Sequence, residues 1–307
     1  MGDSLQTKAE KAAMGWYGDD VATFANAAHV TELAALAPNG PAVTGNINEQ
    51  HADPNQIYAG QWKLADRNQK LGGLESEQDR LKLLNQFTQN DSKVGDPAGM
   101  SGTRCGSTVL IAAAIQGGGI DGVKAIIGQA NADLDPNSPF YDKQKEQMKA
   151  LQESMKGGTL KMGDLHSLNG ILNQQLMAAE QKKYEGKVDD NGNPIVPLMG
   201  VEPDILKEYI AKNAAMKGYF AKGNMSIESV DADGVTPPGA DNGADHFVLH
   251  LAGEGGGSAI YDPFARKDHD QLVFNPEEQK NYQRHQYKPD QIDGSAFGGS
   301  AFAGMYD

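Results

Sequence analysis

The chain contains a single cysteine, Cys105, and the residues around it could activate a thiol. It lies in the segment Gly-Thr-Arg-Cys-Gly-Ser-Thr-Val-Leu-Ile, where a glycine-flanked loop runs directly into an apolar helical stretch. A cysteine in the first turn of a helix lies beside the positive end of the helix dipole and unpaired N–H groups, and both favour the thiolate. Arg104 beside it acts in the same direction. We therefore expect Cys105 to be a nucleophile.

A base and a carboxylate that suit such a nucleophile occur far downstream. Residues 245–251 alternate like a strand and begin with Asp-His-Phe-Val, which places His246 at the start of the strand. After a glycine-rich turn, Asp262 stands in the segment Ala-Ile-Tyr-Asp-Pro. An imidazole can take the thiol proton, and a carboxylate can hold the imidazole in one tautomer. The residue types predict a triad of Cys105, His246 and Asp262 as nucleophile, general base and orienting residue.

His250 is a rival base, because side chains four residues apart lie on the same face of a strand. His246 is preferred because it opens the strand after a loop rich in glycine and aspartate, whereas His250 lies deeper in the apolar run. A metal site of His246, His250 and Asp262 is a further alternative that no paired-cysteine or His-Glu-x-x-His spacing supports. No phosphate-binding glycine motif occurs either, so we expect no metal and no cofactor.

Helical patterns precede strand patterns along the chain, which predicts an α+β fold with the cysteine at a helix N-terminus and an antiparallel sheet at the C-terminal end. The helix that begins at Cys105 is expected to stop at the glycines 117–119, and Asn191-Gly192 predicts a hairpin turn. An acidic stretch at 189–193 is interpreted as part of that turn and not as a calcium loop, because Pro194 occupies the position that requires glycine. The expected helices cover residues 1–37, 57–87, 105–115, 121–129, 139–183 and 201–217, and the expected strands cover 225–230, 246–251, 258–262 and 271–274.

The composition of the chain limits the kinds of molecule that the protein is expected to bind. The net charge of −14 and the pI near 4.9 argue against nucleic acid and anionic membranes as partners. One cysteine permits no intramolecular disulfide. We expect no membrane span and no secretory signal, and therefore a protein that is cytoplasmic as synthesised.

The order and local motifs of these residues resemble those of papain-like cysteine peptidases. His246 follows Cys105 by about 140 residues, as in papain-type chains. Locally, Cys-Gly before a helix of small residues, and His-Phe-Val-Leu followed by Ile-Tyr-Asp-Pro, are similar to the motifs of bacterial peptidases that process bacteriocin leaders. The resemblance covers residues 103–115 and 245–263. It implies a papain-like fold and a cofactor-independent cysteine peptidase or amidase that acts on a protein or peptide substrate.

One position departs from the family pattern. These peptidases carry a glutamine six residues before the cysteine as an oxyanion donor, and this chain has Gly99 there. Either Gln86 or Gln89 supplies the donor from further upstream, or the backbone N–H groups around Cys105 stabilise the developing charge.

The resemblance also leaves the domain roles and the reaction open. Residues 1–95 form a mainly helical region that is a prosegment, a recognition element or part of the core, 96–293 form the papain-like catalytic domain with a helical insertion, and 294–307 form a flexible tail rich in Gly, Ser, Ala and Phe. A transglutaminase-like or other acyltransferase would use the same three residues, and a non-catalytic interaction protein could keep the same core. A bacterial effector, secreted without a signal peptide, is a conjecture from the resemblance. The sequence indicates no oligomeric state.

Overall fold

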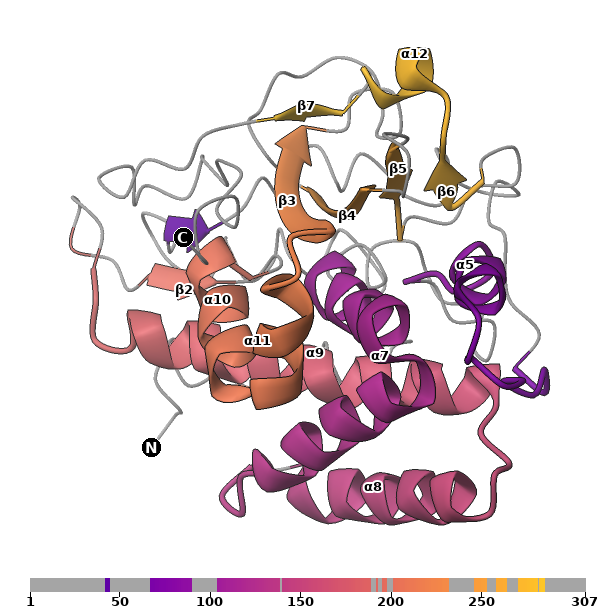
Figure 1. Ribbon diagram of the computed structural model, residues 1–307. Coiled ribbons are helices and arrows are strands. Elements are labelled where there is room, and N and C mark those ends of the chain that lie inside the picture. Colours follow the sequence, from indigo (N-terminus) through magenta and orange to yellow (C-terminus); the bar gives the residue numbers. More distant parts are fainter. Residues whose placement is uncertain are drawn as a thin grey trace, which may run out of the picture.

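Figure 1 shows the computed structural model of the chain, in which a group of helices lies against one antiparallel sheet. The structure describes residues 42–44, 67–89, 104–138, 140–188, 192, 195–197, 201–231, 246–252, 258–263, 270–280 and 282–284. The helices are α5 (Glu77–Leu84), α7 (Cys105–Ala132), α8 (Tyr141–Lys156), α9 (Met162–Tyr184), α10 (Pro203–Lys212), α11 (Ala214–Phe220) and α12 (Pro276–Gln279). The strands are β1 (Ala42–Thr44), β2 (Ile195–Pro197), β3 (Met225–Asp231), β4 (His246–Ala252), β5 (Ser258–Tyr261), β6 (Leu272–Val273) and β7 (Gln283–Arg284).

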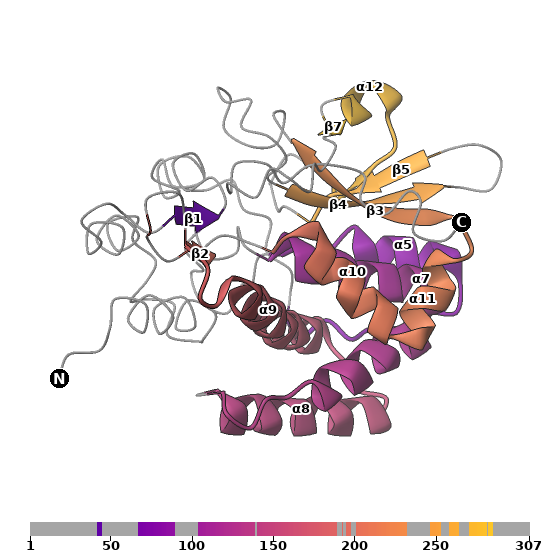
Figure 2. The same ribbon diagram turned by 90° about the vertical axis from the view of Figure 1, so that its left-hand side faces the viewer.

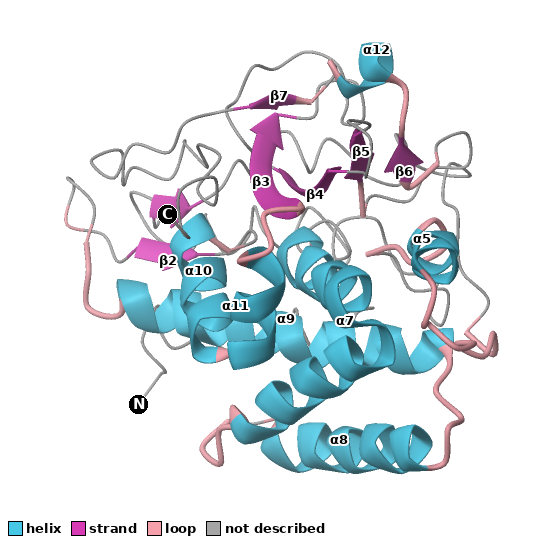
Figure 3. Cartoon of the chain, in the orientation of Figure 1, coloured by secondary structure: helices cyan, strands magenta, loops and turns pink. Residues whose placement is uncertain are grey.

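The expected α+β class is confirmed, because the described residues form helices, a five-stranded antiparallel sheet and a short parallel pair of strands (Figure 3). The five-stranded sheet has the order β6-β5-β4-β3-β7, and each strand runs antiparallel to its neighbours. All four strands expected near the C-terminal end are present, because alternating apolar residues suit a pleated surface that is buried on at least one face. The papain-like topology stays a prediction.

The two faces of the central strand β4 serve different clusters of apolar residues. Phe247, Leu249 and Leu251 belong to the large core that the helices share. Val248 faces the other way and joins a smaller cluster with residues of β3, β5 and β6. Figure 2 shows the sheet above α7 and α11, with α9 and α8 further from it. His246 opens β4 at the edge of this layer, where the sheet meets α7.

Helix α7 has the break that was expected at the glycines 117–119. Two helical segments, which together span Cys105–Ala132, meet at Gly119, whose φ of 54° and ψ of −131° are not helical. A Cβ on Gly119 would lie 2.5 Å from the carbonyl oxygen of Leu74, and one on Gly118 would lie 2.1 Å from the Tyr219 hydroxyl. The glycines therefore allow a bend and close packing, and the helix continues because the buried side chains beyond the bend join the same core.

Two expectations about helices are wrong in part. In the described part, the helix expected over 57–87 is α5 alone, because the backbone of residues 67–71 pairs with that of residues 160–163. The helix expected over 201–217 divides into α10 and α11 at Asn213, whose side chain caps α11. Residues 42–44 form β1, which pairs in parallel with β2, and the hairpin turn expected at Asn191-Gly192 lies mostly outside the described residues.

Some expectations fall outside the described residues, namely the helices over 1–37 and the tail at 294–307. Within the described part, α7 is the one helix that is long and apolar enough to cross a membrane, and 61% of its apolar window is buried inside the protein. A buried core helix meets the same length and composition. The expected absence of a membrane span stays a prediction.

Candidate active site

Cys105 is the first residue of α7, as expected, and only 5% of its surface is exposed. The carbonyl of Arg104 accepts three hydrogen bonds in this turn, from the Thr108 N–H at 2.9 Å and from the hydroxyls of Thr108 and Ser107 at 2.7 and 3.1 Å. The N–H groups of the first turn precede the regular helical pattern and have no partner within it. The thiol therefore lies at the positive end of a 28-residue helix.

Asn169 of α9 connects the first turn of α7 to the core through hydrogen bonds. Its Oδ1 accepts from the Ser107 hydroxyl at 2.5 Å, and its Nδ2 donates to the Thr108 hydroxyl at 3.0 Å. All three side chains are fully buried. The Thr108 hydroxyl donates to the Arg104 carbonyl, and the single Ser107 hydroxyl proton is shared between Asn169 and that carbonyl, so Asn169 helps to position the residue before the nucleophile.

Gly106 lets a second segment approach the nucleophile. A Cβ at this position would lie 3.0 Å from Val201 and 3.4 Å from Leu206, so the first turn of α7 packs directly against the start of α10. Larger side chains would push these two segments apart.

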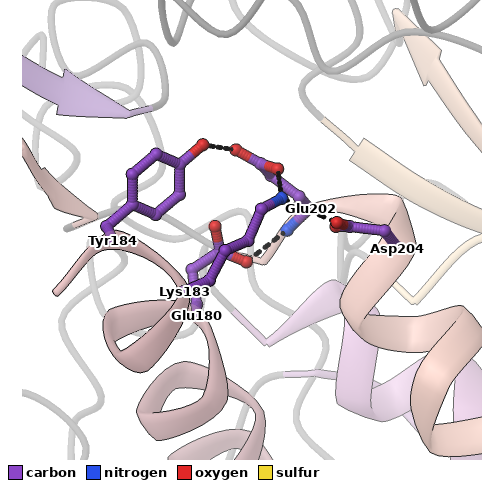
Figure 4. Close-up of polar contacts among 5 residues, drawn as sticks. All are labelled: Glu180, Lys183, Tyr184, Glu202 and Asp204. Atoms are coloured by element: carbon purple, nitrogen blue, oxygen red, sulfur yellow. Dashed lines mark hydrogen bonds and ion pairs between the residues drawn. The ribbon is translucent and has the colours of Figure 1, made fainter. Parts of the chain in front are cut away.

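Figure 4 shows the polar network that holds this start of α10 against the end of α9. The hydroxyl of Tyr184 and the ammonium of Lys183 donate to the two carboxylate oxygens of Glu202, and Lys183 also donates to Asp204 at 2.7 Å. The N–H of Glu202 donates to Glu180 Oε2 at 3.0 Å. Burial and then the charge of Glu202 raise the pKa of Glu180 to about 8. The network thus places Val201, one residue before Glu202, beside Gly106.

The structure brings His246 and Asp262 together from neighbouring strands. His246 Nε2 lies 2.8 Å from Asp262 Oδ1, and both side chains are buried. His246 opens β4 and Asp262 directly follows β5, and these two strands pair antiparallel. The expected orienting contact between carboxylate and imidazole is therefore formed.

Cys105, the first residue of α7, is the third residue of the candidate site. Burial alone would lower the pKa of His246, but the charge of Asp262, hydrogen bonds to Asp262 and Cys105, and the charge of Cys105 raise that pKa to about 10. Nε2 is occupied by Asp262, so the sulfur is left to Nδ1. The three predicted residues therefore lie together, and the pKa of His246 is raised.

Hydrogen bonds fix both the side chain and the backbone of Asp262. Its second oxygen, Oδ2, accepts from the Tyr282 hydroxyl at 2.7 Å. Its backbone N–H donates to the Gln271 carbonyl at 2.7 Å, and Gln271 Nε2 donates back to the Asp262 carbonyl at 3.0 Å. The carboxylate is fully buried with both oxygens bonded, so it can neither rotate away from the imidazole nor reach solvent.

The rival assignments of His250 are not formed in the described part of the chain. Asp262 bonds His246, and His250 lies about 13 Å further along the strand at 3.3 Å per residue. No group of three or more His, Cys, Asp or Glu side chains among the described residues could hold a metal ion.

The two glutamines proposed as oxyanion donors differ in position. Gln86 accepts a hydrogen bond from Gln69. Gln89 is fully buried, and its N–H donates at 2.8 Å to the carbonyl of Pro263, the residue after Asp262. Gly99 lies outside the described residues. Gln89 is therefore the glutamine that lies beside the carboxylate end of the site.

Sequence reasoning missed the residues that position the site, above all Tyr282 and Asn169. Tyr282 follows the last helix in a segment without strand periodicity, and Asn169 lies on a helix 62 residues from Ser107. Asn169 shares the buried face of α9 with the polar residues His166, Asn173 and Glu180, so no sequence signal distinguished it from them.

No protein-family model, curated protein or solved structure matches the chain. The chemistry of this site rests on its own geometry.

Proposed function

We propose that the protein is a cysteine peptidase or amidase of papain-like fold that cleaves a peptide or amide bond in a protein or peptide substrate. The observation that supports the proposal is that His246 bonds the buried Asp262 at 2.8 Å and lies close enough to Cys105 for the cysteine to contribute to its raised pKa. Nucleophile, base and orienting residue in hydrogen-bond reach of one another are what covalent catalysis by a thiol requires.

In the proposed reaction, the Cys105 thiolate attacks the carbonyl carbon of the substrate and forms a C–S bond. The imidazolium of His246 gives its proton to the leaving amine as the C–N bond breaks, which leaves a thioester on Cys105. His246 then takes a proton from water, and the resulting hydroxide attacks the thioester. The acid product departs, and thiolate and imidazolium are restored. Asp262 stays ionised and stabilises the imidazolium throughout.

The negative oxygen of the tetrahedral intermediate also needs donors. The first N–H groups of α7 supply one part, because they lie beside the sulfur and lack helical partners. Of the two glutamines, Gln89 is our candidate for the side-chain donor, because its backbone N–H bonds the carbonyl of Pro263 beside Asp262. Loss of one such donor costs about 10²–10³ in rate, so Gln89→Ala should lower turnover by that factor, whereas Gln86→Ala should not.

Alkylation tests the thiolate and imidazolium pair directly. At pH 7, iodoacetamide should modify Cys105 at least about ten times faster in the wild type than in His246→Ala, because the mutant lacks the cation that holds the thiolate. His250→Ala is the matched control on the same strand and should react like the wild type. Equal rates in all three proteins would make Cys105 a packing residue and favour a non-catalytic interaction protein.

Cleavage is tested with a complex peptide mixture whose products are identified by mass spectrometry. New termini should appear with the wild type and not with Cys105→Ala. A second reaction that contains a primary amine distinguishes hydrolysis from acyl transfer, because an acyltransferase would yield mainly amide products. No Cys105-dependent product in either reaction would contradict the proposal.

A further inference from the structure

Arg104 directly precedes the nucleophile and is the N-cap residue of α7, although its side chain makes no capping hydrogen bond. Only 9% of its surface is exposed. Its backbone carbonyl accepts hydrogen bonds from the first turn of the helix, but its guanidinium forms no hydrogen bond or ion pair with any residue that the structure describes. None of its side-chain nitrogens is completely enclosed. The reaction proposed above gives this charge no partner.

An unpaired cation with so little exposed surface is unusual. Arginine is almost never buried unless it is paired, because the removal of a charge from water costs free energy that only a partner returns. Two partly buried cations elsewhere in the protein follow this rule. Lys183 pairs with two carboxylates at the start of α10, and Arg80 donates to two backbone carbonyls before α5. Because the nitrogens of Arg104 remain accessible, a molecule from outside the chain can complete its pair.

The surroundings of Arg104 favour an anion as that molecule. The helix dipole and the N–H groups of the first turn make the start of α7 positive. Burial alone would lower the pKa of His246, but Asp262 and Cys105 raise that pKa to about 10, so the imidazole is a second positive group at neutral pH. The carboxylates of Asp262 and Glu202 already have donors. The planar fork of a guanidinium matches the two oxygens of a carboxylate.

The position of Arg104 in the chain places its charge near the bond that would be cleaved. Its Cα is about 3.8 Å from that of Cys105, and an arginine side chain is about as long as two residues of an extended peptide, at roughly 3.3–3.6 Å per residue. A peptide whose carbonyl carbon is bonded to the Cys105 sulfur therefore has its neighbouring residues within reach of the guanidinium. The carboxylates that a peptide carries are those of Asp, Glu and the C-terminus.

We propose that Arg104 forms a subsite for a carboxylate of the substrate, carried next to the scissile bond. The guanidinium donates to both carboxylate oxygens and thereby holds the peptide in register with the Cys105 sulfur. Arg104 is then a residue that determines specificity, and the substrates are acidic around the cleaved bond or end close to it. This inference rests on the proposed function, because the molecule that Arg104 holds is the one with which Cys105 reacts.

Two alkylating reagents test the subsite without any peptide. Iodoacetate carries a carboxylate and iodoacetamide is its neutral analogue, and both react with the same Cys105 thiolate. The ratio of their rate constants at pH 7 therefore cancels the thiolate population and reports how well a carboxylate is held beside the sulfur. In Arg104→Gln the ratio of iodoacetate to iodoacetamide should fall about three- to tenfold, because one charge-assisted bond is lost. Arg104→Lys keeps the charge without the fork and should give an intermediate ratio.

Arg80→Gln is the matched control, because it removes one positive charge from a side chain that is bonded elsewhere, and its ratio should equal that of the wild type. An equal fall in Arg104→Gln and Arg80→Gln would overturn the proposal, since it would reflect net charge alone. If Arg104→Gln slows both reagents by the same factor, the guanidinium serves the thiolate and not a substrate, which would overturn the proposal too. Should the glutamine variant fail to fold, an unchanged ratio in Arg104→Lys would have the same meaning.

Peptides then distinguish the source of the carboxylate. The wild type should cleave peptides with Asp or Glu within two residues of the scissile bond at least about fivefold faster than matched Asn or Gln peptides, and Arg104→Gln should remove this preference. A preference that disappears only when the C-terminus is amidated assigns the subsite to the C-terminal carboxylate. Cleavage without either preference would overturn the subsite and leave the proposed function intact. Absence of any Cys105-dependent cleavage would contradict the proposed function, whereas the alkylation ratio would still decide whether Arg104 holds a carboxylate.

Discussion

Asp262 controls the charge of His246 at the scale of single residues. A buried histidine without a partner loses its proton easily, because burial disfavours the charged form. Here the carboxylate at 2.8 Å reverses that tendency and raises the pKa of His246 to about 10. The imidazolium should therefore persist from neutral pH to strongly alkaline pH, and with it the proton that the proposed reaction transfers to the leaving amine.

Replacement of Asp262 by asparagine tests this dependence. The amide keeps the shape of the side chain but removes its charge, so the pKa of His246 should fall. We expect kcat/KM to drop on the order of 10³–10⁴-fold, as for the orienting carboxylate of other triads. The alkaline limb of the pH profile should also move from about pH 10 in the wild type to lower pH in Asp262→Asn. An alkaline limb that stays in place would contradict the assignment of Asp262.

The three residues of the candidate site were predictable because few side chains can act as nucleophile, base and orienting group. Cys105 is the one cysteine of the chain, and His246 and Asp262 stand at strand ends. Tyr282 was not predictable, because a tyrosine after a loop has many possible partners and only the folded sheet brings it to Asp262. The local sequence pattern therefore identifies the residues that could react, whereas the residues that position them depend on tertiary packing.

At the scale of elements, the attachment of α7 to α9 depends on Asn169. Asn169→Leu keeps the approximate volume but removes both hydrogen bonds to the first turn of α7. It should lower the free energy of unfolding by about 1–3 kcal/mol, measured by urea denaturation.

Asn173 of the same helix is the matched control for that change. It is equally buried, but neither of its side-chain polar atoms has a partner within the described part of the chain. Asn173→Leu should therefore be neutral or stabilising, because a buried amide without partners carries an uncompensated desolvation cost. If the two variants lose equal stability, the bonds from Asn169 contribute nothing specific.

The junction of α9 and α10 should make stability depend on pH. The pKa of Glu180 is about 8 in the folded protein and about 4.5 when unfolded, so the folded state holds a proton that the unfolded state releases. The contribution of Glu180 to the free energy of unfolding is fully present below about pH 4.5 and is lost as the pH rises through 8. Between these two pH values the contribution falls by up to about 1.4 kcal/mol per pH unit.

Glu180→Gln checks this dependence, since it keeps an oxygen for the N–H of Glu202 but cannot ionise. The variant should be more stable than the wild type at pH 8.5 and close to it at pH 5, measured by thermal unfolding at both values. A difference between the two proteins that does not change with pH would contradict the proposed ionisation of Glu180.

Strands were more predictable than helix ends in this protein. In β4 and β5 the sequence shows short apolar runs that are buried on both faces, and such a run between turn residues indicates a strand before any tertiary contact is known. The helix expected across Gly72 and Gly73 does not form, because residues 69–71 bond the backbone near Leu160. The bend at Gly119 likewise depends on Leu74, which lies in another segment. The positions of these helix ends and bends therefore depend on contacts with residues that are distant in the sequence.

At the scale of the whole molecule, the kink in α7 allows the two halves of the helix to pack against different parts of the protein. Its first half packs beneath the sheet, and its second half packs with α8 and α9. Gly119→Ala should destabilise the protein by about 2–4 kcal/mol, because a φ of 54° disfavours a Cβ that would also meet the Leu74 carbonyl at 2.5 Å.

Gly128, exposed in the second half of the same helix, provides the control for the kink. A Cβ there meets nothing within 4 Å, so Gly128→Ala should stabilise by about 0.5–1 kcal/mol. Chemical denaturation of both variants checks the pair. If both variants change stability in the same direction, the helix tolerates a side chain at the bend.

The solitary cysteine also determines how the protein responds to oxidants. In the proposed pair of Cys105 and His246, the thiolate is the form that peroxide attacks, and the first product is a sulfenic acid. In many redox-sensitive proteins a second cysteine captures that product as a disulfide, but this chain offers none. Rescue must then come from an outside thiol such as glutathione before further oxidation to the irreversible sulfinic acid. Oxidative inactivation should therefore be reversible only for as long as a small thiol is at hand.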